Sequence, residues 1–361
     1  MSTAAYKQVI ETPARHRLDL FLATANRLGA PIGNIEKDFW VCWTLNALYH
    51  ERPAGAPRLL FKGGTSLSKA YGLIQRFSED IDITVFRDDL AEPASVEELE
   101  ALSNKKRRAR LDAIRNACRA YIIGPLREFL AEQIADATGG AGRIEIDEAD
   151  PDGQTLLLWY PEVEPRDGAY VRPAVRIESG AKSALDPNRP VTIRPYIVEE
   201  STGLELGIDD VTTVEATRTF WDKVVIAHGL RRWYERRGVL RQEGQRVSRH
   251  YYDLHCLLNS AVGQVALADR EFGADCVRHA RMFFDRPDYD LASAVPGTFA
   301  IEPIAGMVGA LQGDYANTAP MIFGVAPRFA DILASAAKIE QRLNDGVDRL
   351  RQRDSDADSE N

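Results

Sequence analysis

Residues 59–86 read LLFKGGTSLSKAYGLIQRFSEDIDITVF, and this stretch holds the pattern that decides the fold. The apolar run at 58–61 is closed by Gly63 and Gly64, which predicts a short buried strand that ends in a turn. From residue 80 to residue 86, acidic or polar side chains alternate with aliphatic ones, as they do along a half-buried strand. The stretch therefore predicts two strands that flank a glycine turn.

Two acidic residues, Asp80 and Asp82, occupy alternate positions of the second predicted strand. Residues at i and i+2 of a strand project to the same face, here with β-carbons about 7 Å apart. Two carboxylates at that separation repel each other unless a cation lies between them. Hard divalent ions, above all Mg²⁺, suit oxygen ligands and also bind nucleotide phosphates. Asp80 and Asp82 are therefore the predicted metal ligands and catalytic carboxylates.

The glycine turn supplies the second half of the predicted site. Gly63 and Gly64 have no side chains, so a phosphate group can approach their backbone amides closely. A helix that starts at Thr65 or Ser66 would direct its positive end toward the same anion. A solvated acidic strand after an ordinary Gly-Gly turn is the alternative. The presence of both features in one short segment favours a nucleotide-binding site formed by these four residues.

The remainder of the chain predicts a mixed α/β half followed by a helical half. Strands are expected at 143–146, 155–160, 171–177 and 191–198. Helices are expected at 14–50 (two, around a break at 29–31), 66–74, 95–137, 215–236, 247–258, 267–284 and 327–351. The predicted class is α+β with a mixed sheet. The predicted domains are residues 1–210, residues 211–350 as a helical domain that completes the active site, and residues 351–361 as a disordered acidic tail.

Composition and charge narrow the classes of protein further. With 361 residues, 45% hydrophobic and 27% charged, the chain has an ordinary globular composition, and no apolar run is long enough to span a membrane. Four scattered cysteines and the lack of a secretory signal indicate a cytoplasmic protein. The net charge of −9 argues against a generally basic nucleic-acid-binding surface. An arginine-rich segment, 231–241, could hold RNA phosphates or form a solvated helix face.

The segments GGTSL at 63–67 and RFSEDID at 76–82 resemble the signature of the AbiEii/AbiGii/MenT nucleotidyltransferase toxins, a branch of the DNA polymerase β-like superfamily. The resemblance extends to further motifs, which are EKDFW at 36–40, RTFWDK at 218–223, RHYYDL at 249–254 and MIFG at 321–324. It implies a polymerase β-like nucleotidyltransferase core in the N-terminal half, with helices in the C-terminal half.

The resemblance, or the polymerase β-like fold that it implies, points to three further catalytic residues. Lys223 matches the family's catalytic lysine and would offset the charge of the nucleotide's triphosphate; a solvent-exposed helix lysine is the alternative. Asp253 matches the acidic residue of the last catalytic motif and would orient Lys223 or join the polar site, unless it pairs with Arg249 one helical turn away. Glu178 ends a predicted strand, where polymerase β-like folds commonly carry a third acid.

The resemblance also implies a reaction and its partners. The chain would transfer a nucleoside monophosphate from an NTP to an acceptor hydroxyl, with one or two Mg²⁺ ions. The implied acceptor is the 3′ end of tRNA, so that aminoacylation stops, and the implied partner is a cognate antitoxin protein. Two alternatives remain at this point, namely a protein or small-molecule acceptor and a non-catalytic member that only binds nucleotide.

Overall fold

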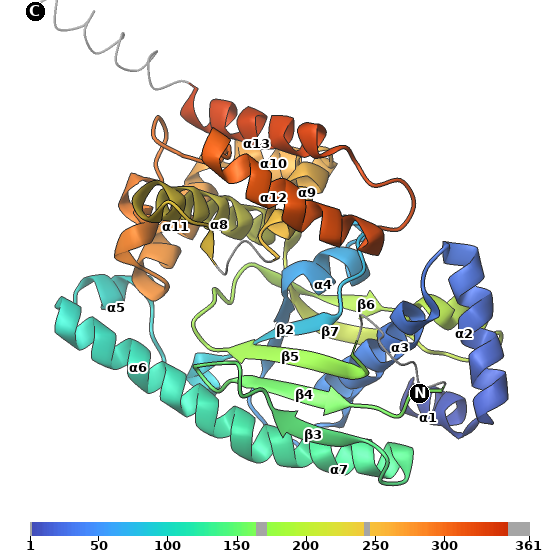
Figure 1. Ribbon diagram of the computed structural model, residues 1–361. Helices are drawn as coiled ribbons and strands as arrows, with labels where there is room; N and C mark the ends of the chain where they lie inside the picture. Colours follow the sequence, from blue (N-terminus) through green and yellow to red (C-terminus); the bar gives the residue numbers. More distant parts are fainter. Residues whose placement is uncertain (1, 164–171, 242–245, 346–361) are drawn as a thin grey trace, which may run out of the picture. The chain divides into compact units, whose positions relative to one another are not determined.

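The computed structural model of the chain describes residues 2–163, 172–241 and 246–345, and the predicted tail at 351–361 lies outside them. The chain divides into two compact units, which are Met1–Glu215 and Ala216–Asn361. The first unit contains a seven-stranded sheet in the order β3-β4-β5-β2-β1-β7-β6, drawn in Figure 1. The second unit, in the described ranges, is built from helices. This architecture confirms the predicted α+β class with a mixed sheet.

The strands of the sheet are β1 (Leu59–Lys62), β2 (Asp80–Val85), β3 (Arg143–Ile146), β4 (Thr155–Trp159), β5 (Ala174–Gly180), β6 (Asn188–Ile193) and β7 (Ile208–Val214). The α-helices of the first unit are α1 (Ser2–Glu11), α2 (Ala14–Leu28), α3 (Ile32–Asn46), α4 (Gly63–Lys69), α5 (Val96–Glu100), α6 (Asn104–Tyr121) and α7 (Arg127–Thr138). Short 3-10 turns include η2 (Arg87–Leu90) and η4 (Tyr196–Glu199).

Strand β2 lies near the centre of the sheet, antiparallel to β1 and parallel to β5. One side of β2 is fully buried, because Ile81, Ile83 and Val85 are all inaccessible to solvent. Burial of such aliphatic side chains supplies roughly 1.5–3 kcal/mol each, which fixes which face of the strand turns outward. Asp80 and Asp82 therefore share the opposite face, as the alternation in the sequence predicts.

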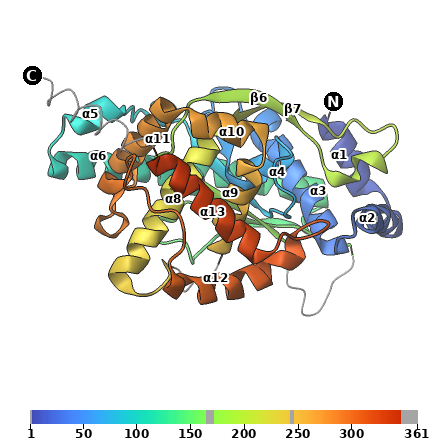
Figure 2. The same cartoon turned by 90° about the horizontal axis from the view of Figure 1, so that it is seen from above.

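The second unit contains α8 (Ala216–Arg237), α9 (Ser248–Leu258), α10 (Ala261–Ala268), α11 (Arg270–Phe283), α12 (Ala305–Thr318) and α13 (Phe329–Asn344). Within this unit α9 packs against α8, α12 and α13, and Figure 2 shows α13 lying across α9. None of the helices in the described ranges has the length and apolarity that crossing a membrane requires.

Candidate nucleotidyl transfer site

The acidic face of the sheet is formed by three adjacent strands of the first unit. In the strand register, Asp82 of β2 lies beside Lys62 of β1 on one side and beside Glu178 of β5 on the other. Asp80 lies beside Arg176 of β5 in the same register. Neighbours in register project to the same face of a sheet. The structure thus brings the predicted third acid, Glu178, next to the predicted pair of aspartates.

The glycine turn lies directly against the Asp82 carboxylate. Gly63 begins α4 with a φ of +78°, and a β-carbon added there would lie 1.9 Å from Oδ2 of Asp82. At Gly64, an added β-carbon would lie 2.2 Å from Nη2 of Arg76. A side chain at the first glycine would collide with the Asp82 carboxylate, and one at the second with the Arg76 guanidinium group. These contacts explain the glycine at both positions. The helix expected at 66–74 instead begins at the turn itself and ends at Lys69.

The hydroxyl groups of Thr65 and Ser66 fasten the turn to the strand. Both residues are fully buried. The Thr65 hydroxyl donates to the backbone carbonyl of Asp80 and lies 2.7 Å from Oγ of Ser78, whereas the Ser66 hydroxyl donates to the carbonyl of Gly63 at 2.9 Å. These side chains hold the turn's shape. Neither hydroxyl is free of protein contacts, so the prediction of nucleotide binding at Thr65 and Ser66 now concerns their backbone amides.

Glu178 carries the clearest electrostatic signature of the site. Burial, together with the negative charges of Asp82 and Asp80, raises its pKa from the ordinary 4.5 to about 7, against the opposing effect of Arg176. Arg176 forms ion pairs with Glu178 and, at 3.0 Å, with Asp147. The sequence indicated neither contact of Arg176, although the alternation along β5 places it on the face of Glu178. The site therefore holds an excess of negative charge that favours an added cation.

This shift in the pKa of Glu178 predicts a pH-dependent stability. A carboxyl group with a raised folded-state pKa stabilises the fold at low pH, and that contribution disappears as the pH rises from about 4.5 to about 7. In EDTA, the free energy of unfolding of the wild type should fall over this range. The free energy of unfolding of Glu178→Gln should fall less. Urea unfolding at a series of pH values measures both; equal pH slopes for the two proteins would contradict the assignment.

The donor set around Asp82 fits magnesium better than a metal held entirely by protein groups. Among the residues that the structure describes, no group of three or more His, Cys, Asp or Glu side chains is arranged to hold a metal ion. Mg²⁺ is typically bound through one or two carboxylates, with water and substrate phosphates as its other ligands. The adjacent carboxylates of Asp80 and Asp82 match that requirement, and the glycine turn lies directly beside Asp82.

The other two predicted catalytic residues form a buried ion pair in the second unit. Nζ of Lys223, in the middle of α8, lies 2.7 Å from Oδ2 of Asp253 on α9. Their side chains are 8% and 0% exposed. A buried ammonium group that is paired with a buried carboxylate is held in a fixed direction. This geometry agrees with the predicted role of Asp253 in orienting Lys223, and it excludes Lys223 as a solvent-exposed helix lysine.

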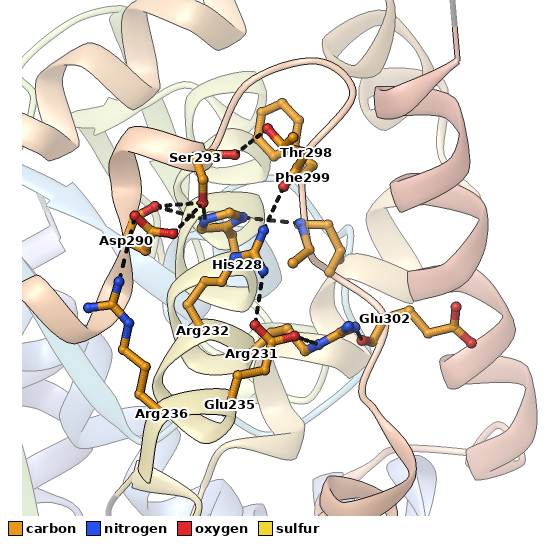
Figure 3. A network of polar contacts seen from close by, with 12 residues as sticks. His228, Arg231, Arg232, Glu235, Arg236, Asp290, Ser293, Thr298, Phe299 and Glu302 are labelled. Carbon is orange, nitrogen blue, oxygen red and sulfur yellow. Dashed lines mark hydrogen bonds and ion pairs between the residues drawn. The ribbon is translucent and has the colours of Figure 1, made fainter. Parts of the chain in front are cut away.

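The arginine-rich part of α8 packs against residues 285–302 of its own unit, as Figure 3 shows. Arg231 donates to the backbone carbonyl of Glu302, Arg232 donates to that of Thr298 at 3.0 Å, and Arg236 lies 3.8 Å from Asp290. Glu235 pairs with the first two arginines of this group. Arg231 and Arg232 are thus held against their own unit, whereas Arg236 and Arg237 are exposed, and the choice between an RNA surface and a solvated face stays a prediction.

His228 lies at the centre of the same network (Figure 3). Its Nδ1 accepts a hydrogen bond from the backbone N–H of Ala300 at 3.1 Å, so Nε2 carries the proton and faces the carbonyl of Asp290 at 3.2 Å. Burial lowers the pKa of His228, which keeps the ring neutral. His228 is a structural residue.

Replacement of Arg232 by methionine should therefore affect stability more than catalysis. The change removes this donor and the ion pair with Glu235, and because the carbonyl of Thr298 is at the surface we expect a loss of about 0.5–1.5 kcal/mol in the free energy of unfolding. Urea unfolding measures the loss. Arg328→Met, which breaks an exposed ion pair with Asp331, is the control and should cost less than about 1 kcal/mol. Equal costs for the two variants would argue against the network.

A carboxylate pair on a central strand, with a glycine turn against it, is the arrangement that the sequence motifs predict for a nucleotidyltransferase. A family model described as "Nucleotidyl transferase AbiEii toxin, Type IV TA system" matches residues 46–335. The chain belongs to this family of nucleotidyltransferase toxins, as the motifs predict. Among solved structures it is similar to MenT4, a nucleotidyltransferase toxin from Mycobacterium tuberculosis, with 16% identity, 92% of each chain covered and a TM-score of 0.47. A search of curated proteins gave no match.

Proposed function

We propose that this toxin transfers a nucleoside monophosphate from an NTP to the 3′-terminal hydroxyl of tRNA in the cytoplasm, and so blocks translation until a cognate antitoxin neutralises it. The observation that carries the transfer half of the proposal is the contact between the Asp82 carboxylate and the backbone of Gly63. Because of that contact, the proposed metal ligand lies beside the proposed phosphate-binding turn. The chain belongs to a family of toxins from type IV toxin–antitoxin systems, which supports a cognate antitoxin as its partner.

The reaction assigns a task to each predicted residue. The acceptor oxygen attacks the α-phosphorus, the bond from that phosphorus to the bridging oxygen breaks, and pyrophosphate leaves with the bonding electrons. Asp80 and Asp82 would hold Mg²⁺, which when bound offsets the negative charge of the phosphates. Gly63 and Gly64 would admit the triphosphate to the backbone amides. Glu178, with its raised pKa, would take the proton of the attacking hydroxyl.

Lys223 and Asp253 complete this assignment from the second unit. The ammonium group of Lys223 would stabilise the charge that develops on the departing pyrophosphate. Asp253, fully buried and 2.7 Å away, would hold that ammonium group in its direction. We expect Lys223→Met to lower kcat and Asp253→Asn to lower it less, because the asparagine still accepts a hydrogen bond.

The decisive experiment incubates the purified chain with Mg²⁺, tRNA and each of the four radiolabelled NTPs, beside Asp82→Ala. Label that appears in tRNA with the wild type, and not with Asp82→Ala, supports the proposal. Parallel incubations with total cellular protein and with a small-molecule extract test the other acceptors. Transfer to protein or to small molecules, with none to tRNA, would show that the chain is a nucleotidyltransferase with an acceptor other than tRNA.

A non-catalytic, nucleotide-binding role makes the opposite prediction. In that case Asp80→Ala would still arrest growth when expressed without the antitoxin. The complete set of Gly63, Gly64, Asp80, Asp82 and Lys223 argues against this role, because a protein that only binds nucleotide need not keep all of them.

A further inference from the structure

Two consecutive residues of α3 form buried ion pairs with the two halves of the site. Nζ of Lys37 lies 2.6 Å from Oε2 of Glu79, the residue directly before Asp80, and their side chains are 4% and 12% exposed. Nζ of Lys69, the last residue of α4, lies 2.6 Å from Oδ1 of Asp38, and both side chains are 3% exposed. One pair thus reaches the start of the carboxylate strand, and the other reaches the helix that begins with the glycine turn.

Each pair has a further contact that fixes its direction. The second carboxylate oxygen of Asp38 accepts a hydrogen bond from the backbone N–H of Tyr196 at 2.7 Å. Nζ of Lys69 also lies 3.7 Å from the centroid of the Tyr196 ring, a cation–π contact. Lys37 donates weakly to the backbone carbonyl of Arg172, at 3.4 Å. The four charged groups are therefore held in one arrangement by several partners.

The helical geometry of α3 explains how adjacent residues serve separate elements. Consecutive side chains on an α-helix point about 100° apart, so Lys37 and Asp38 reach in different directions. Their charges are opposite, and so are those of their partners, so that exchanging partners would bring like charges together. This arrangement sets the position of Glu79 relative to α4, and with it the position of the carboxylate strand relative to the glycine turn.

Stability alone does not account for four buried charges. The free energy needed to remove two charges from water is about as large as the free energy gained from their attraction. Well-packed apolar side chains in the same place often give equal stability. A buried pair is, however, sensitive to geometry, because both partners must meet in one place. Here the pairs join α3 to the elements on both sides of the site.

We propose that Lys37 and Asp38 are positioning residues of the transfer reaction, which hold the metal-binding strand and the phosphate-binding turn at their working separation. The proposal rests on the proposed function for its kinetic readouts. The Lys37–Glu79 pair positions Asp80 and Asp82, so its loss should weaken metal binding and lower kcat. The Asp38–Lys69 pair positions the glycine turn, so its loss should raise the KM for NTP.

The first test removes both charges of one pair at a time, which avoids an unpaired buried charge. For Lys37→Met with Glu79→Gln, we expect kcat and Mn²⁺ affinity to fall at least about tenfold, with KM for NTP nearly unchanged. For Asp38→Asn with Lys69→Met, we expect KM to rise about tenfold and Mn²⁺ affinity to stay near the wild-type value. Mn²⁺ affinity is measured without NTP, from the electron paramagnetic resonance signal of the free ion.

The control is a double variant at the opposite end of the same two strands. Arg58, just before β1, pairs through two nitrogens with Asp89, which follows β2. Arg58→Met with Asp89→Asn should leave kcat, KM and Mn²⁺ affinity at wild-type values. The reversed pair Lys37→Glu with Glu79→Lys should recover kcat, because the bridge between α3 and the strand is restored.

The outcomes separate this proposal from the proposed function. Folded neutral variants with wild-type kcat, KM and Mn²⁺ affinity would overturn the positioning role. If a neutral variant fails to fold, the reversed Lys37–Glu79 variant decides: folded and active supports the role, folded and inactive overturns it. If the wild type transfers no nucleotide, the proposed function fails, and a selective loss of Mn²⁺ affinity in the Lys37–Glu79 variant still supports the positioning role.

Discussion

Asp82→Asn should abolish nucleotidyl transfer, with a loss of at least about a thousandfold, while the protein stays folded. The Asp82 carboxylate faces Glu178 in the strand register and lies against Gly63, so asparagine keeps its shape and loses only its charge. A thousandfold loss corresponds to about 4 kcal/mol of transition-state stabilisation, a reasonable share for a ligand of the metal. Transfer of label from NTP to acceptor, with saturating Mg²⁺, measures the effect.

The same change should not destabilise the metal-free protein. The charge of Asp82 contributes to the raised pKa of Glu178, so its removal relieves a repulsion in the folded state. We therefore expect an unfolding midpoint in EDTA equal to or above that of the wild type. Asp88→Asn is the control, since Asp88 is exposed and follows the same strand at its other end. An active Asp82→Asn variant, or one that loses activity only through unfolding, would remove Asp82 from the catalytic site.

The sequence predicted the centre of the site because the information there is local. The alternation in β2 decides the face of Asp80 and Asp82, and close contacts account for the paired glycines. Glu178 was predicted from its place at the end of a strand and from the third acid common in polymerase β-like folds. That strand was expected at 171–177 and is observed at Ala174–Gly180. Residue 171 of the expected range lies outside the described residues.

The partners of the charged side chains could not be predicted in this way, because they lie far away in the sequence. Arg176 reaches Asp147 only after β4 and β5 have paired, and Lys37 reaches Glu79 only after α3 has packed. A charged residue without a known partner is expected at the surface. For this reason the burial of Lys37, and of the Lys223 pair, becomes evident only in the folded structure.

Some elements were missed for reasons of local propensity. Helix α12 contains three glycines, which weaken the helical pattern, and it was not predicted. Strand β7 was treated as the boundary between the halves because Asp209 and Asp210 interrupt its apolar alternation; Asp210 has a φ of +53°. Helix α1 was also missed. Helix α10 was not predicted either, and of these four errors only the omission of β7 changes the order of the sheet.

Gly63→Ala should reduce nucleotidyl transfer at least about a hundredfold, because it displaces the proposed metal ligand Asp82 without removing it. The added β-carbon would lie 1.9 Å from Oδ2 of Asp82, so the carboxylate must move away from the turn. The backbone at φ +78° adds strain of about 1–2 kcal/mol for any residue with a side chain. Transfer assays and thermal unfolding measure the two effects separately.

Gly55→Ala separates the displacement of the carboxylate from the backbone strain. Gly55 has a φ of +83°, and a β-carbon added there meets no atom within 4 Å. The two alanine variants therefore share the cost in stability, since both force a left-handed backbone on a residue with a side chain. Only Gly63→Ala moves the Asp82 carboxylate, so only this variant should lose transfer activity. Equal activity in the two variants would show that the contact between turn and carboxylate does not matter for the reaction, and the central geometric argument for the site would fail.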